Sequence, residues 1–298
     1  MKPARIAIAL LAAAAFVASA QAQELTGTLK KIKDTGSITL AVRESSIPFS
    51  YYDNQQNTIG YSYDIALRIV DAIKQDLKLA QLTIKRIPVT PANRIQLIQN
   101  GTVDLECGST TNNTARQKQV DFSNTIFIIG TRLLVNKSSG IKDFPDLAGK
   151  NVVTTAGTTS EEILRKMNED KKMHMNLISA KDHGESFLTL QSGRAVAFMM
   201  DDALLYGERA KARNPADWIV VGTPQSKEAY GCMLRKGDAT FKKLADETIA
   251  KIETGGEALK LYHKWFQSPI PPKGLNLDFP LSVDMAELYK HPNDKAFQ

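Results

Sequence analysis

Residues 94–105, RIQLIQNGTVDL, decide the fold, because residues 186–198, SFLTLQSGRAVAF, repeat their pattern. In each stretch a run with apolar residues at helical spacing ends in glutamine, a small residue and glycine, and an apolar run follows. A glycine after the last turn ends a helix, and the apolar run predicts a strand. The same helix–strand unit in both halves therefore predicts two similar α/β lobes.

Strands and helices are predicted to alternate along the chain on either side of these two helix–strand units. The predicted strands are 37–42, 82–89, 102–107, 151–155 and 195–200, and the predicted helices include 62–79, 182–191 and one that begins at Thr159. Strands alternating with helices indicate βαβ units. We therefore expect each lobe to be a mostly parallel sheet flanked by helices.

The lobe boundaries follow from two crossings of the chain. The apolar run 126–134 is read as a strand that leaves the first lobe, and 230–234 as a strand that rejoins it. We expect lobe 1 to comprise residues 29–131 plus 228–298, and lobe 2 to comprise residues 132–227. Helices are expected at 239–253 and 257–265, and a proline-containing tail from Pro269 is expected to wrap the surface.

The composition is that of an ordinary globular protein. The 298 residues are 43% hydrophobic and 23% charged, which excludes disordered and fibrous classes and suggests two domains. The net charge of +6 is spread along the chain, and the short basic run 209–213 is read as a solvated helix face. We therefore expect no nucleic-acid partner.

The first 22 residues resemble a secretory signal peptide. Lys2 and Arg5 precede an uncharged apolar run, 6–18, and Ala20-Gln21-Ala22 forms an A-x-A cleavage site. We expect export and cleavage after Ala22.

Cys107 and Cys232 are the two cysteines of the chain. An exported protein meets an oxidising compartment, and an even count permits one disulfide. We expect a Cys107–Cys232 bridge that brings both segments into one lobe. Two separate buried thiols are the alternative.

Polar residues follow four of the predicted strands. They are Arg43 after the first, 108–113 after the third, 156–160 after the fourth and Asp201 after the fifth. Parallel α/β sheets bind ligands at the carboxyl ends of their strands, so two such edges facing each other would enclose a small polar ligand. The same residue types also form caps and turns, which is the structural alternative.

Common catalytic signatures are absent from the sequence: no Walker A, HExxH, CxxC or GxSxG pattern occurs. Three of the four histidines lie in polar stretches, whereas His183 lies at a predicted helix start. The residues therefore favour binding over catalysis.

At these positions the chain resembles the periplasmic glutamate/aspartate-binding proteins of ABC amino-acid uptake systems, within solute-binding protein family 3. The resemblance covers residues from about Leu29 to the C-terminus and is carried by 42–44 (VRE), 48–52 (PFSYY), 60–64 (GYSYD), 106–113 (ECGSTTNN), Arg116, 179–184 (SAKDHG) and 198–203 (FMMDDA).

The resemblance implies a two-lobed Venus-flytrap fold that closes on L-glutamate or L-aspartate and delivers it to a membrane permease. It also implies a monomer, no enzymatic activity, no cofactor and no metal. The implied contacts are Arg116, Thr111 and Thr159 with the α-carboxylate, Ser109 and Asp201 with the α-ammonium, and Arg43, Arg94 and His183 with the side-chain carboxylate.

Three alternatives remain at this point. The fold is also used for other polar amino acids such as glutamine, although Arg43 and Arg94 disfavour a neutral side chain. A periplasmic enzyme or a sensory ectodomain on the same fold are the others.

Overall fold

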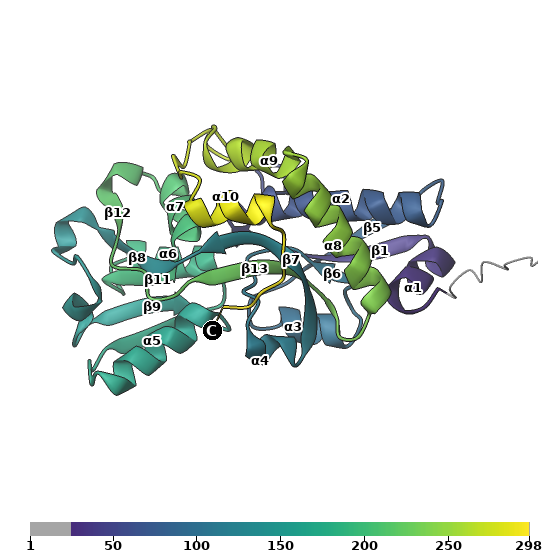
Figure 1. The fold of residues 1–298 in the computed structure, drawn as a ribbon. Coiled ribbons are helices and arrows are strands. Elements are labelled where there is room, and N and C mark those ends of the chain that lie inside the picture. Colours follow the sequence, from purple (N-terminus) through teal and green to yellow (C-terminus); the bar gives the residue numbers. More distant parts are fainter. Residues whose placement is uncertain (1–24, 298) are drawn as a thin grey trace, which may run out of the picture.

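A computed structural model describes residues 25–297 as an α/β molecule in which two five-stranded sheets lie side by side (Figure 1). The predicted α/β class with two sheets and flanking helices is confirmed. The predicted signal peptide and its cleavage site lie outside the described residues. Within residues 25–297, no helix has both the length and the apolar character needed to cross a bilayer.

The first sheet has the strand order β5-β1-β6-β13-β7. Its strands are β1 (Ser37–Val42), β5 (Thr83–Pro88), β6 (Leu105–Glu106), β7 (Val120–Ile129) and β13 (Glu228–Arg235). β1 is parallel to β5 and β6, whereas β13 is antiparallel to β6 and β7. Only β13 therefore runs against the other strands of this sheet.

The second sheet repeats this arrangement in the order β10-β9-β11-β8-β12. Its strands are β8 (Thr131–Asn136), β9 (Asn151–Thr155), β10 (Asn176–Ala180), β11 (Ala197–Asp201) and β12 (Trp218–Val221). β9 is parallel to β10 and β11, and β8 is antiparallel to β11 and β12. Each sheet is thus mostly parallel with one reversed strand.

Helices cover both faces of each sheet. In Figure 1, α2, α8, α9 and α10 lie above the first sheet and α3 and α4 below it. The helices are α1 (Gly27–Thr35), α2 (Tyr61–Asp76), α3 (Arg94–Gln99), α4 (Thr114–Gln117), α5 (Thr159–Asp170), α6 (His183–Gln191), α7 (Asp202–Lys211), α8 (Ala239–Thr254), α9 (Glu257–Phe266) and α10 (Val283–Lys290). Short 3₁₀ turns at Lys137–Ser139, Phe144–Leu147 and Pro215–Asp217, and a small sheet of β2 (Ser45–Ser46), β3 (Ser50–Tyr52) and β4 (Thr58–Ile59), complete the fold.

Three elements differ from the sequence prediction. The tail expected only to wrap the surface contains α10, which Ser282 caps and whose Met285 is buried. The run 126–134 is not one strand but parts of β7 and β8, which Gly130 separates. Strand β6 is shorter than the predicted 102–107: just before it, the Asp104 N–H donates to Thr39 O at 2.8 Å, while the Asp104 carboxylate, rather than a carbonyl, accepts the Thr39 N–H at 2.9 Å.

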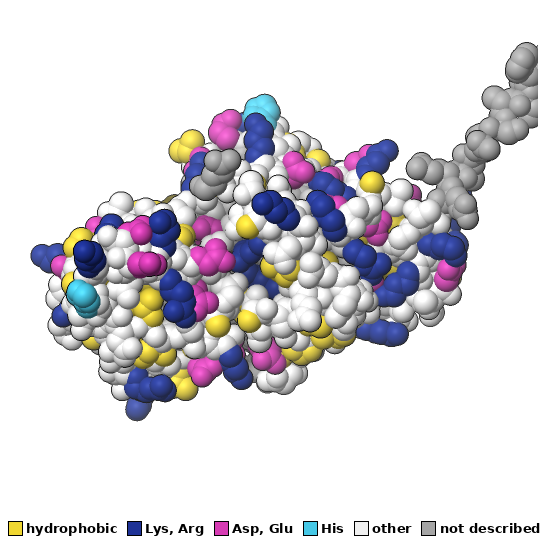
Figure 2. Space-filling model, turned by 90° about the horizontal axis from the view of Figure 1, so that it is seen from below, with side chains coloured by type: hydrophobic (Ala, Val, Ile, Leu, Met, Phe, Trp, Pro, Cys, Tyr) yellow, Lys and Arg dark blue, Asp and Glu magenta, His cyan; other side chains and the backbone are white. Residues whose placement is uncertain are grey.

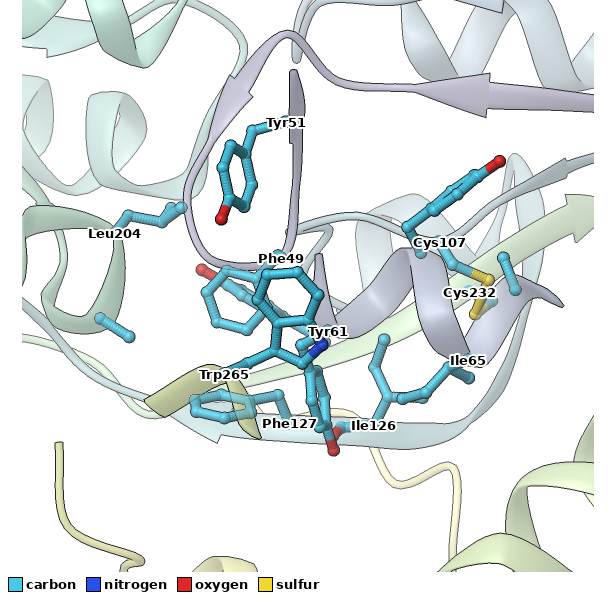
Figure 3. Close-up of a cluster of buried hydrophobic side chains, with 14 of the residues drawn as sticks. Phe49, Tyr51, Tyr61, Ile65, Cys107, Ile126, Phe127, Leu204, Cys232 and Trp265 are labelled. Atoms are coloured by element: carbon cyan, nitrogen blue, oxygen red, sulfur yellow. A yellow bond between two sulfur atoms is a disulfide. The ribbon is translucent and has the colours of Figure 1, made fainter. Parts of the chain in front are cut away.

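An aromatic cluster fills the core of the first sheet. Figure 3 shows Phe49, Tyr61 and Phe127 packed together, with Leu204 of α7 entering from the second half of the molecule. The ring of Phe49 meets that of Phe127 edge to face, with 4.9 Å between ring centroids. These rings bury large apolar areas, so they contribute strongly to the packing of this core.

The predicted disulfide between Cys107 and Cys232 is present. It joins the loop after β6 to the centre of β13 across a sequence separation of 125 residues. A bridge that closes a loop of this length restricts the unfolded chain and stabilises the fold by about 2–4 kcal/mol.

The chain passes between the two sheets at two adjacent places, Gly130 and residues 222–227. Gln225 donates its N–H to Thr131 O at 3.1 Å, and the hydroxyls of Thr131 and Ser226 are 3.1 Å apart. A Cβ on Gly130 would lie 3.0 Å from Ser226 O, so the absence of a side chain allows this close approach. The two crossings therefore form a paired connection between the sheets.

Candidate functional site

The eight residues predicted to bind a ligand come together where the carboxyl ends of the two sheets face each other. Each is at most 9% exposed. Those from the first half are Arg43 after β1, Arg94 at the start of α3, Ser109 and Thr111 after β6, and Arg116 in α4. Those from the second half are Thr159 at the start of α5, His183 at the start of α6 and Asp201 at the end of β11.

Arg43, Arg94 and Ser109 form one corner of the site. Arg43 Nη1 donates to Ser109 Oγ at 3.3 Å, and Arg94 Nη1 donates to the Ser109 carbonyl at 3.0 Å. The buried Nε of Arg94 has no hydrogen-bond partner among residues 25–297. Because an unpaired buried donor is costly, this nitrogen is suited to an anionic ligand group.

His183 joins this corner from the opposite half. Its Nε2 is 3.3 Å from Arg43 Nη2, and its Nδ1 is 2.9 Å from Thr155 Oγ1. Burial, followed by the charge of Arg43, lowers the pKa of His183 well below its usual value, so the ring is neutral. A guanidinium only donates, so Nε2 accepts and the proton is assigned to Nδ1, which donates to Thr155.

Arg116 spans the junction. Its Nη1 donates to the Thr111 carbonyl at 3.0 Å, and its Nη2 donates to the Gly157 carbonyl of the opposite half at 3.3 Å. Asn113 caps α4 by accepting the N–H of Arg116 at 2.9 Å, which fixes the backbone from which this side chain extends. A planar guanidinium held in this way is suited to bidentate contact with a carboxylate.

Asp201 lies on the other side of the site. It accepts hydrogen bonds from Ser160 Oγ at 3.3 Å and from the hydroxyl of Tyr230 in β13. Nearby, Glu228 Oε2 accepts from Thr159 Oγ1 at 3.1 Å. Burial, together with the charge of Glu228, raises the pKa of Asp201 to about 8. A cation placed here would restore the ionised carboxylate.

The arginines lie in a poorly solvated, mutually repelling group. Burial, followed by the charge of Arg116, lowers the pKa of Arg94 to about 9. Burial also lowers the pKa of Arg43, and the carboxylate of Glu106 partly offsets this shift. Burial lowers the pKa of Arg116, while nearby acidic residues oppose the shift.

Sequence reasoning missed four polar residues of the site: Glu106, Thr155, Glu228 and Tyr230. Glu106 and Glu228 are 0% and 3% exposed, so the site holds more negative charge than a count of Asp201 alone indicates. Glu106 lies within the quoted ECGSTTNN segment, which could have drawn attention to it. Glu228 and Tyr230 lie in β13, whose return to this junction is a tertiary feature.

Known proteins are similar to this chain in sequence and in fold. A model of the bacterial extracellular solute-binding proteins, family 3, matches residues 38–268. The chain is 62% identical over 297 residues to the L-glutamate/L-aspartate-binding protein of Pseudomonas aeruginosa, covering 98% of each chain. It is 60% identical over 296 residues to the glutamate/aspartate import solute-binding protein of Escherichia coli K12, covering 99% of this chain and 98% of that one.

Solved structures agree with the fold. An ancestral arginine-binding protein bound to glutamine is 27% identical, with a TM-score of 0.69 over 78% of this chain and 98% of that one. The cysteine-binding protein of Campylobacter jejuni, at 24% identity, shares the fold with a TM-score of 0.73 over 87% of this chain and 97% of that one. Family model, relatives and fold agree, and the chain belongs to the bacterial extracellular solute-binding proteins of family 3.

Proposed function

We propose that this protein captures L-glutamate and L-aspartate between its two lobes and delivers them to an ABC permease. The observation that carries the proposal is the group of three buried arginines, Arg43, Arg94 and Arg116, at the junction of the lobes. Buried cations are costly, so a ligand with two carboxylates is the complement they favour. The printed functions of the two relatives support the same ligands.

The α-carboxylate is assigned to Arg116, Thr111 and Thr159. Arg116 contacts both halves of the junction, so a carboxylate bound to it would lie at the junction, with Thr159 of the second half as its further partner. Thr159 begins α5, a helix of 12 residues whose N-terminal N–H groups favour an anion. Every amino acid has this carboxylate, so this part of the site gives affinity without side-chain selection.

The side-chain carboxylate is assigned to Arg43, Arg94 and His183. Arg94 contributes the unpaired Nε, and Arg43 and His183 lie in contact with each other. His183 is neutral, so it would donate to the carboxylate from Nε2 in the tautomer in which Nδ1 accepts from the Thr155 hydroxyl. The two guanidiniums therefore supply the charge that selects an acidic ligand over glutamine.

The α-ammonium is assigned to Ser109 and Asp201. The ligand cation would lower the pKa of Asp201 from about 8, since it favours the charged carboxylate. Tyr230 and Ser160 already hold this carboxylate in position from both sides.

Residues 29–131 plus 228–298 are proposed as one lobe and 132–227 as the other, hinged at the paired crossings. A ligand that contacts both lobes favours the closed arrangement, and the permease recognises that arrangement. Export to the periplasm, with cleavage of the signal peptide after Ala22, and a monomeric state complete the proposal. Family membership makes the chain a solute-binding protein rather than an enzyme.

A thermal-shift screen of the twenty amino acids tests this function. A saturating ligand raises stability by RT ln(1 + [L]/Kd), about 4 kcal/mol at a thousandfold excess over Kd. Glutamate and aspartate should give the two largest shifts. A largest shift from glutamine or a basic amino acid would contradict the proposed ligand.

A further inference from the structure

Glu106 is a buried carboxylate beside the Arg43 side chain, and no assigned ligand contact uses it. It ends β6 and is 0% exposed. Its Oε2 accepts a hydrogen bond from Thr110 Oγ1 at 2.7 Å, whereas Oε1 has no hydrogen-bond partner within residues 25–297. A carboxylate oxygen left unpaired in the interior calls for an electrostatic explanation.

The charge of Glu106 acts on the site arginines. Burial lowers the pKa of Arg43, and Glu106 is the strongest of the charges that oppose this shift. In Arg94, burial and the charge of Arg116 lower the pKa, and Glu106 again opposes them. Glu106 thus stabilises the charged form of both arginines assigned to the side-chain carboxylate.

Gly108 places this carboxylate in the structure. A Cβ on Gly108 would collide with Glu106 Oε1 and would lie 3.3 Å from Arg43 Cγ. The unpaired oxygen therefore lies directly against the backbone of the loop that carries Ser109, beside the Arg43 side chain. A side chain at position 108 would push the carboxylate out of this place.

We propose that Glu106 is the resident counter-charge of Arg43 and Arg94 and sets how strongly the site selects a negatively charged ligand side chain. The inference rests on the proposed function. Glu106 balances one of the two positive charges, which keeps the site stable when it is empty, but it repels the incoming side-chain carboxylate. A neutral side chain at position 106 would remove both effects.

The test compares E106Q with the wild type by calorimetric titration of glutamate and glutamine, and by thermal unfolding without ligand. We expect the ratio of the glutamine Kd to the glutamate Kd to rise roughly tenfold in E106Q, because only glutamate carries the repelled charge. The ligand-free melting temperature should fall, because two buried guanidiniums lose their counter-charge. A residue with only a structural role would not raise selectivity while lowering stability.

D104N is the matched control. Asp104 lies two positions earlier, is 1% exposed, and pairs with Lys31 at 2.7 Å and with the Thr39 N–H at 2.9 Å. Its removal should lower stability and leave the glutamate-to-glutamine selectivity unchanged. G108A is a second variant, which displaces the carboxylate without removing it and should raise the selectivity by a smaller factor than E106Q.

Each outcome decides the inference. An unchanged or lower selectivity in folded E106Q would overturn it, as would an equal rise in D104N. If E106Q does not fold even in excess glutamate, an unchanged selectivity in G108A overturns it and a rise supports it. A wild type that does not prefer glutamate to glutamine would instead refute the proposed function.

Discussion

Replacing Arg94 with methionine should separate ligand binding from stability. Arg94 is 1% exposed, and burial lowers its pKa to about 9, which reflects the cost of holding its charge in the interior. A lowering of this size from the ordinary value of an arginine corresponds to a cost of about 5 kcal/mol at neutral pH. R94M removes this cost and keeps a side chain of similar length, so we expect the ligand-free protein to melt at a higher temperature than the wild type.

Glutamate binding should move in the opposite direction. Removing one member of a buried charge pair costs about 3–5 kcal/mol, or roughly 10²- to 10⁴-fold in affinity. R94M should therefore bind glutamate and aspartate at least a hundredfold more weakly than the wild type does. The affinity for glutamine should fall far less, because the glutamine amide carries no charge.

The assay is calorimetric titration with the three ligands and thermal unfolding without ligand. R194M is the control, because Arg194 is an exposed arginine in the turn between α6 and β11. It should change neither the melting temperature nor any affinity by much. An R94M protein that binds glutamate as tightly as the wild type would refute the assignment of Arg94 to the side-chain carboxylate.

Three further predictions concern the fold. Burial raises the pKa of Glu253 to about 9, and both its carboxylate oxygens lack partners within residues 25–297. The pKa of Glu253 is higher in the folded than in the unfolded protein. The free energy of unfolding is therefore unaffected by this group below pH 4.5 and falls by roughly 1.4 kcal/mol per pH unit from there to about pH 9. Denaturant unfolding measured from pH 5 to 9 should show that this decline is flatter in E253M than in the wild type. The control E247M, on the exposed face of α8, should keep the decline of the wild type. Reduction of the Cys107–Cys232 bridge should cost about 2–4 kcal/mol of unfolding free energy, with ligand binding retained; two titratable thiols in the oxidised, unfolded protein would show that the bridge is absent. G157A should raise the Kd of every amino-acid ligand, and this Kd should be roughly tenfold higher in G157A than in G193A. Both glycines have a φ of 76°, but only a Cβ at 157 meets the opposite half, 2.6 Å from Ala92 Cα; equal titration results for the two variants would contradict a closure contact there.

Local patterns predicted most of the secondary structure. Strands β1 and β9 have the predicted bounds, 37–42 and 151–155, because each is a short apolar run between polar residues. Helix α10 was missed because it lies in a proline-containing tail and buries its apolar side against α8 only after the chain has folded. β6 was overpredicted at its start, where the Asp104 carboxylate accepts the Thr39 N–H that a carbonyl of a longer ladder would otherwise accept, although the Asp104 N–H still donates to Thr39 O.

The site was predictable only in part. The resemblance supplied Arg43, Arg94 and Arg116, since conspicuous cations occur in recognisable segments. Glu106 and Glu228 were missed because an isolated acid in a strand looks the same whether it faces water or a guanidinium from a distant segment. Their burial follows from the pairing of β13 with β6 and β7 and from the closeness of the two sheets, which no short stretch of sequence encodes.

Calorimetric titration of the wild-type protein with glutamate, aspartate and glutamine, one ligand per titration, tests the central claim most directly. If three buried arginines form the binding site for a dicarboxylic amino acid, glutamate and aspartate should each bind with a stoichiometry of about one, and glutamine at least a hundredfold more weakly. Glutamine binding as tight as glutamate binding, or no heat with either acidic ligand, would contradict the claim.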